Sequence, residues 1–226
     1  MATAMPAASG TVRRLGTQHA AWFVHGLGTE ALTIDLQGLV DLLGGAGDGC
    51  RDGARFAIVR MTRGATLVHE GAHAQTLYVV QTGSFKAVKT AEDGYEHVLA
   101  FSSQRDLIGY DGLYREHYAF SAVALEDSRV VALPMAGLAA LRQRSPALDA
   151  ALQALIARQL AHAGEIAEVM SAVAADARLA RFLVQLSARM AERGQSPRRL
   201  LLRMNRRDIA NHLGLAHETI SRSFRL

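Results

Sequence analysis

The stretch MNRRDIANHLGLAHETISRSFRL, residues 204–226, predicts two short helices joined by a tight turn. A helix-turn-helix unit needs a small residue in its first helix, a turn residue that accepts a positive φ, and apolar residues that hold the helices together. Ala210 and Gly214 meet the first two needs, and Asn205 can cap the first helix with Asp208 three positions later. The apolar positions are Ile209, Leu213, Leu215 and Ile220. An ordinary helical bundle shares part of this spacing, but it has no need for glycine at the turn.

The second helix of this unit is expected to begin near Ala216 and to enter the major groove of DNA. Groups on its outward N-terminal face can read base edges, because arginine donates two hydrogen bonds to guanine and a carboxylate accepts one from cytosine. The predicted base-reading residues are His217, Glu218, Ser221 and Arg222. The predicted phosphate contacts are Arg203, Arg206, Arg207 and Thr219. Double-stranded DNA is therefore the expected partner.

Positive charge gathers in the same part of the chain. Residues 198–226 carry seven arginines and two acidic residues, a balance of +5, whereas the formal charge of the whole chain is +4. Such a cluster is typical of a polyanion partner, because basic side chains displace counterions from phosphates. The alternative is a solvated face in an arginine-rich protein, so charge alone does not identify the partner.

Residues 55–133 predict antiparallel β structure. Short runs rich in Val, Leu, Phe and Tyr alternate with glycines at the spacing of tight turns. A flat sheet of these strands would leave its edge strands unpaired, so we expect a rolled, jelly-roll arrangement. Before them, residues 36–43 predict a short helix that ends at a glycine pair.

After Pro134 the sequence becomes rich in Ala, Leu, Gln and Arg, and a long helix is expected over residues 145–175. Apolar and small residues repeat along it with the alternating spacing of a two-stranded coiled coil. These positions are Ile156, Leu160, Ala163, Ala167 and Met170. The stripe predicts a homodimer, and the alternative is that it packs on the β-roll.

The expected fold is α+β, with an N-terminal antiparallel β-roll, a long central helix and a C-terminal helix-turn-helix. The expected parts are a flexible arm over residues 1–30, a β-roll sensor domain over 31–144, a dimerisation helix over 145–175, and a DNA-binding domain over 176–226.

These residues resemble the Crp/Fnr family of bacterial transcription regulators, and most of all its Fnr-like branch. The resemblance runs from about residue 55 to the C-terminus and is most specific over residues 177–222. It implies a cyclic-nucleotide-binding-like β-roll, a homodimer, and a palindromic DNA site similar to TTGAT and its inverted repeat. It also implies that residues 91–98 touch RNA polymerase. The family continues into a β wing after the recognition helix, whereas the printed chain ends at Leu226 within that helix.

The sequence departs from the family at two kinds of sensor site. Cys50 is the only cysteine, and Val131 stands about where cluster-binding relatives have their β-roll cysteine, so no iron–sulfur (4Fe–4S) cluster is expected. Relatives that bind cyclic AMP have an arginine before a Ser or Thr that holds the phosphate, whereas here Phe120 precedes Ser121. Without that guanidinium we do not expect cyclic AMP to bind, and the cofactor or effector is unknown.

Haem is a further candidate, because His19 and His25 flank Trp22 and an imidazole can bind haem iron. The alternative is that these are surface histidines, and no metal-ligand spacing recurs in the chain. Aromatic residues of the β-roll either line a small apolar pocket or simply belong to its core. They are Tyr78, Phe101, Tyr110, Tyr118 and Phe120.

The sequence has no nucleophile–base pair, phosphate loop or metal-ligand motif, so an enzyme is not expected. No apolar run approaches the ~20 residues of a membrane span, and the N-terminus lacks the apolar core of a secretory signal. We therefore expect a cytoplasmic DNA-binding transcription regulator without a membrane partner. The alternative is an effector- or haem-binding sensor or interaction module with weak or no DNA binding.

Overall fold

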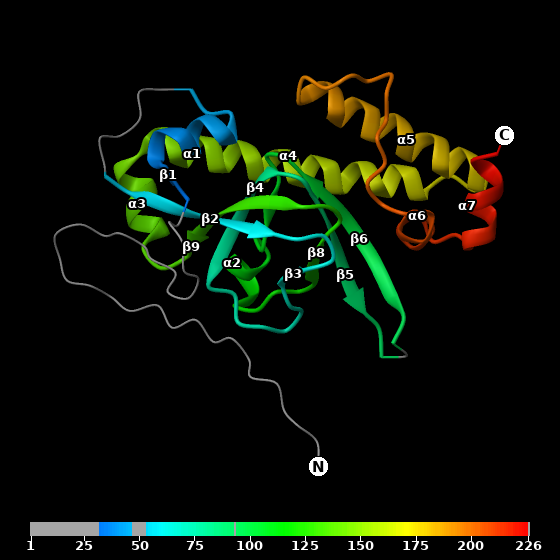
Figure 1. Cartoon of the computed structure of the whole chain (residues 1–226), viewed down its shortest axis with the longest axis horizontal. Coiled ribbons are helices and arrows are strands. Elements are labelled where there is room, and N and C mark those ends of the chain that lie inside the picture. Colours follow the sequence, from blue (N-terminus) through cyan, green and yellow to red (C-terminus); the bar gives the residue numbers. More distant parts are fainter. Residues whose placement is uncertain (1–31, 47–52, 93, 226) are drawn as a thin grey trace, which may run out of the picture.

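A computed structural model describes residues 32–46, 53–92 and 94–225 of the chain (Figure 1). The expected arm over residues 1–30, with His19 and His25, lies outside these residues. Two β-sheets form a roll, and a long helix runs past the roll towards the C-terminal helices. The α+β prediction is confirmed.

The first sheet has the order β1-β2-β9-β4-β7, and the second has the order β3-β8-β5-β6, with antiparallel pairs throughout. The strands of the first sheet are β1 (Thr33–Asp35), β2 (Arg55–Met61), β9 (Ser128–Pro134), β4 (Thr76–Thr82) and β7 (Leu107–Ile108). Those of the second are β3 (Thr66–Val68), β8 (Ser121–Ala124), β5 (Ser84–Thr90) and β6 (Glu96–Ser103).

The first sheet is covered on both faces. Val79 and Val80 are neighbours on β4, and both side chains are fully buried. Because successive residues of a strand point to opposite faces, they enter different cores. Val80 packs inside the roll with Phe85 of β5, whereas Val79 packs under the helices. The covering helices are α1 (Leu36–Leu43), α3 (Leu138–Arg144) and the first half of α4 (Pro146–Met170).

The chain passes from the first sheet to the second through a single residue, Gly83, between β4 and β5. Its φ of +90° is costly for other residues, and a Cβ there would lie 2.8 Å from the Cα of Ser128. A glycine is therefore required at this corner of the roll.

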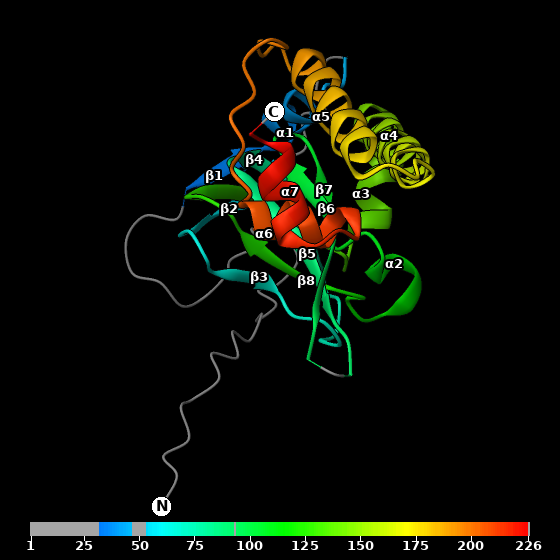
Figure 2. The same ribbon diagram turned by 90° about the vertical axis from the view of Figure 1, so that its right-hand side faces the viewer.

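The C-terminal half contains α4, α5 (Ala175–Glu192), α6 (Arg206–Leu213) and α7 (His217–Ser223), while the short α2 (Gly112–Arg115) belongs to the roll. Ser145 caps α4 by accepting a hydrogen bond from Leu148 N, and Pro146 follows as its first residue. The helix ends at Met170 instead of near residue 175, because the chain reverses there into α5, which packs back along α4 (Figure 2).

Candidate nucleic-acid interface

Helices α6 and α7 form the helix-turn-helix that residues 204–226 predict. Asn205 Oδ1 accepts from Asp208 N at 2.8 Å, and Asp208 Oδ2 accepts from Asn205 N at 3.3 Å, so a reciprocal capping box begins α6. Gly214 ends α6 with a φ of +61°. Ala216 precedes α7 without a side-chain cap. The two helices share a buried core with α5 and the end of α4, formed by Val169, Leu179, Phe182, Ile209, Ala210, Leu213 and Ile220.

The predicted base-reading residues all lie on α7. His217, Glu218 and Arg222 are exposed, and Ser221 is half-buried. Glu218 and Arg222 lie two positions before and after Ile220 and so face away from it, and Ile220 is fully buried in the core. The helix therefore offers a carboxylate, a guanidinium, a hydroxyl and an imidazole to a partner outside the domain.

The predicted phosphate contacts differ in their surroundings. Arg206 and Arg207 are exposed, and the Arg206 guanidinium lies 5.6 Å from the ring centre of Phe224. Thr219 is half-buried. Arg203 Nε lies 3.0 Å from Glu126 Oε2, between β8 and β9, so its guanidinium must leave that carboxylate before it can contact a phosphate.

Helix α6 is docked on the outer face of the hairpin formed by β5 and β6 (Figure 2). Lys86 Nζ lies 2.7 Å from Asp208 Oδ1, and both side chains are largely buried. Tyr95 Oη donates to Asn211 Oδ1 at 2.6 Å, and Asn211 Nδ2 donates to Glu96 O at 3.1 Å. These bonds join the helix-turn-helix to the β-roll of the same chain.

His212 lies at the centre of this docking contact. Its Nδ1 is 3.1 Å from Val98 O, and its ring meets the edges of Phe101 and Phe182 with centroids 4.9 and 5.5 Å away. Burial lowers the pKa of His212, the hydrogen bond to Val98 opposes that shift, and Arg189 adds to it. A carbonyl acceptor at Nδ1 places the proton of the neutral ring on that nitrogen.

A second contact joins the C-terminal end of α5 to the turn between β6 and β7. Arg193 Nη2 lies 3.0 Å from both carboxylate oxygens of Asp106, and its Nε donates to Gln104 O at 2.8 Å. Arg105 in this turn has a φ of +69°, which is strained for a residue with a Cβ. Arg193 thus ties a strained turn of the β-roll to the half of the chain that contains the helix-turn-helix.

The predicted dimerisation residues are exposed along α4. Leu160 is 75% exposed, and Ile156 and Met170 are 39% and 38% exposed. Ala163 and Ala167 are exposed too. Among the described residues, the stripe is not covered by the β-roll.

Two family models match the chain. They are the Cyclic nucleotide-binding domain over residues 58–145 and the Crp-like helix-turn-helix domain over residues 177–226. The fumarate and nitrate reduction regulatory proteins of Escherichia coli and Shigella dysenteriae are each 36% identical to it over 160 residues, 71% of this chain and 64% of each relative. The chain belongs to the Crp/Fnr family. It spans less than two thirds of those relatives' own length.

Solved structures of the Crp/Fnr family have the same fold. The chain is 25% identical to FixK2 from Bradyrhizobium japonicum, with a TM-score of 0.64 over 75% of this chain and 83% of that one. A CRP-family transcriptional regulator from Thermus thermophilus is 22% identical, with a TM-score of 0.60 over 74% and 82%. The named relatives are regulators, not enzymes.

The β-roll holds Asp111 and Ser121 near the place where the resemblance implies a cyclic phosphate. Asp111 Oδ2 accepts a hydrogen bond from Ala119 N at 2.5 Å, and Asp111 Oδ1 is buried without a partner among the described residues. A carboxylate in this place repels a phosphate. The Ser121 hydroxyl already accepts from Glu70 N at 2.9 Å. With Phe120 before Ser121, no guanidinium stands at the position that the family uses.

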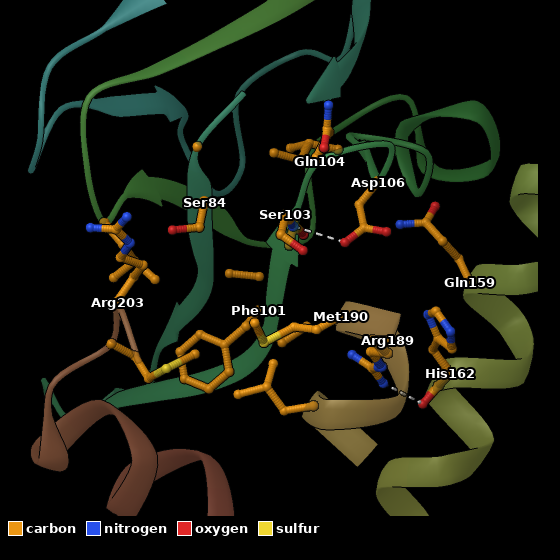
Figure 3. A pocket seen from close by; sticks show the side chains of 18 of the residues that line it. Ser84, Phe101, Ser103, Gln104, Asp106, Gln159, His162, Arg189, Met190 and Arg203 are labelled. Carbon is orange, nitrogen blue, oxygen red and sulfur yellow. Dashed lines mark hydrogen bonds between the residues drawn. The ribbon is translucent and has the colours of Figure 1, made fainter. Parts of the chain in front are cut away.

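The aromatic residues of the roll divide into two groups. Tyr78, Tyr118 and Phe120 pack in or against its core, and burial raises the pKa of Tyr118 to about 12 while its hydroxyl donates to Thr76 O. Phe101 instead packs with the helix-turn-helix, and Tyr110 is 39% exposed. Phe101, Tyr110 and Phe120 line one cavity that the roll shares with the helices (Figure 3), as the pocket alternative expected, whereas Tyr118 belongs to the core of the roll and Tyr78 packs against it.

Among the residues with described positions, no three His, Cys, Asp or Glu side chains gather where they could hold a metal ion. None of the helices in those segments is long and apolar enough to cross a membrane.

The sequence did not reveal the docking residues Lys86, Tyr95, Asn211 and His212, or the pair of Asp106 and Arg193. No local signal marks them, because their partners lie far along the chain. A weak hint was that only two of the 25 basic residues are lysines, and that Lys86 stands among apolar strand residues.

Proposed function

We propose that this chain is a DNA-binding transcription regulator of the Crp/Fnr type, which binds as a homodimer to a palindrome similar to TTGAT and its inverted repeat. The observation that carries the proposal is the exposed face of α7, where Glu218 in the first turn and Arg222 in the last turn stand on a helix-turn-helix with a capped first helix and a packed core. Arg222 donates to guanine O6 and N7, and Glu218 accepts from cytosine N4. Ser221 and His217 supply the neighbouring contacts.

Phosphate contacts from Arg206, Arg207 and Thr219 fix the position of α7 in the groove, and Arg203 joins them once it leaves Glu126. The exposed stripe on α4, from Ile156 to Met170, supports dimerisation. A two-fold dimer presents two α7 helices to two half-sites, which accounts for a palindromic target.

The regulator acts in the cytoplasm, where it contacts RNA polymerase through residues 91–98 at the tip of the β5–β6 hairpin.

It senses something other than cyclic AMP or a four-cysteine iron–sulfur cluster, since Asp111 and Phe120 disfavour a phosphate and Cys50 is the single cysteine. Haem at His19 and His25 is tested by adding haem to the purified protein and recording Soret absorbance.

A fluorescence-anisotropy titration tests the DNA proposal. The purified chain is mixed with a labelled duplex that contains TTGAT and ATCAA, and with a scrambled duplex of equal composition, at fixed salt. We expect the palindrome to bind at least about a thousandfold more tightly than the scrambled duplex. Equal affinity for both duplexes would instead support a sensor or interaction module that does not read DNA sequence.

A further inference from the structure

A pair of histidines lies where two loops of the β-roll meet. His73 precedes β4, His117 follows α2, and their backbones form an antiparallel β-bridge. The amides of Ala74 and Tyr118 donate to carbonyl oxygens of the opposite loop at 2.8 and 2.9 Å, so the hydrogen bonds flank the two histidines instead of joining them. In such a non-hydrogen-bonded pair the Cα atoms are about 4.5 Å apart and both side chains project from the same face. The fold therefore places two imidazoles side by side.

The distance between the two rings fits a shared metal ion. The ring centroids of His73 and His117 are 5.5 Å apart, with an interplanar angle of 68°. A tetrahedral ion holds imidazole nitrogens at about 2.1 Å, which places the centres of its two rings roughly 5 Å apart. Little movement of either ring is then needed to bring one nitrogen of each to the same ion. Both histidines are exposed, so water can complete the coordination.

His117 has its lone pair on the outer ring nitrogen. Its Nδ1 lies 3.4 Å from Arg115 O, and because a carbonyl oxygen can only accept, the proton of the neutral ring is on Nδ1. Nε2 is then the nitrogen that can bind a metal ion. Histidines that bind metals commonly donate their other ring N–H to a backbone carbonyl, since that bond fixes the tautomer and the ring orientation.

The two loops are held together by the protein itself. Gly112, at the start of α2, packs so closely on Ala74 that the space between them has no room for a Cβ. Asp111 Oδ2 accepts from Ala119 N and closes the loop that carries His117. Because these segments are already ordered, binding an ion between them costs little further conformational entropy.

The charges near His117 favour an ion that is selected by nitrogen ligands. A hollow beside this histidine is lined by two cations and one anion, which are Lys89, Arg115 and Glu70. The Glu70 carboxylate is engaged, because its Oε2 accepts from Thr90 N at 3.2 Å. Magnesium and calcium ions need several oxygen ligands, which this arrangement does not offer. Imidazole nitrogen, by contrast, is a good ligand for zinc, copper and nickel.

We propose that His73 and His117 bind one zinc ion between them, through Nε2 of His117 and a ring nitrogen of His73, and that water completes the coordination. The ion ties the loop before β4 to the loop that follows α2, so the opening of this part of the β-roll depends on zinc. Zinc binding does not rest on the proposed DNA-binding function and is tested without DNA.

Hydrogen exchange of the full chain, with and without zinc chloride, tests the proposal. Peptides that contain the amides of Ala74 and Tyr118 should exchange at least about tenfold more slowly at about 1 mM zinc, because an ion that binds only the closed loops lowers the open population. Magnesium at the same concentration should have no effect. This local measurement is insensitive to zinc bound elsewhere on the chain, including at His19 or His25. Unchanged exchange with zinc, or equal slowing by magnesium, overturns the proposal.

Two substitutions and a control locate the ligands. His73→Gln and His117→Gln each remove one imidazole, so each should abolish the slowing by zinc. His69→Gln is the matched control, because His69 is another exposed histidine in the same loop as His73, and it should keep the full effect. All three positions are exposed, so the substitutions should leave the fold intact. Slowing that persists in both His73→Gln and His117→Gln, or that is lost in His69→Gln, contradicts the assignment.

Discussion

Arg222 and Arg207 are both exposed arginines of the helix-turn-helix, but we expect them to contribute differently to DNA binding. Arg222→Ala should cost about 1–3 kcal/mol on the palindrome and relax the preference at one base pair. Arg207→Ala should weaken all sequences alike and reduce the slope of affinity against salt by about one. Anisotropy titrations against single-base variants of the half-site, at several salt concentrations, distinguish the two. A uniform loss for Arg222→Ala would mean that it binds phosphate.

For single residues, the sequence predicts well those roles that depend only on neighbours in the chain. Asn205, Asp208 and Gly214 were recognised because a capping box and a left-handed helix end need only neighbouring residues. Arg203 was predicted to bind phosphate, and the structure places it against Glu126, which no spacing along the chain indicates. A side chain's charge can be read from the sequence, but its partner cannot.

Among the elements, the ion pair of Lys86 and Asp208 links β5 to α6. Lys86→Ala leaves the Asp208 side chain, only 6% exposed, without its cation, and should lower the free energy of unfolding by about 3 kcal/mol. Urea denaturation measures this loss. Lys89→Ala is the control, because Lys89 is on the same strand and exposed, and its effect should stay within about 0.5 kcal/mol. Equal effects of the two substitutions would show that the pair does not hold the helix.

The contact between α6 and β6 should weaken in acid. Burial, which is the largest cause, lowers the pKa of His212 below its ordinary value of 6.5 in the folded chain. The contact therefore keeps its full stability above about pH 6.5 and loses it as the pH falls further, because the unfolded chain takes up the proton first. Hydrogen exchange of β6 amides between about pH 7.5 and 5.5 measures the loss. His212→Gln should lose less of its β6 protection over this pH range than the parent protein loses. His162 is kept in both proteins, because burial lowers its pKa as well and the comparison must isolate His212.

The predicted helices and strands largely agree with the structure, because the apolar residues of each recur with a clear period. Residues 36–43 form α1 as expected, and residues 55–133 form antiparallel strands as expected. The short β1 and β7 were missed, because three and two residues are too few to show alternation. The long helix ends at Met170, before residue 175. The sequence did not predict this end, because an alanine-rich segment favours helix throughout and does not mark where the chain reverses.

For the whole molecule, family and fold follow from the sequence, but the relation between its halves does not. The buried pair of Asp106 and Arg193 and the cavity beside Gln159 and Arg189 exist only once α5 has folded back along α4. Their residues come from segments that lie far apart in the sequence. Sequence periodicity reports which face of a helix is buried, but not which surface buries it.

The same limit applies to the proposed homodimer, because spacing along the sequence predicts a seam on α4 and the exposure of its residues allows that seam to be tested. Leu160 on α4 is 75% exposed and Val184 on α5 is 69% exposed, yet only Leu160 belongs to the predicted seam. Leu160→Glu would bring two carboxylates together at the centre of the seam, so it should convert the dimer to a monomer at micromolar concentration. Val184→Glu places the same charge on an equally exposed apolar site outside the seam and should leave the dimer intact. Sedimentation equilibrium distinguishes the two species. If Leu160→Glu stays dimeric, or Val184→Glu alone dissociates, the chains associate through another surface, and two half-sites could not be bound through an α4 seam.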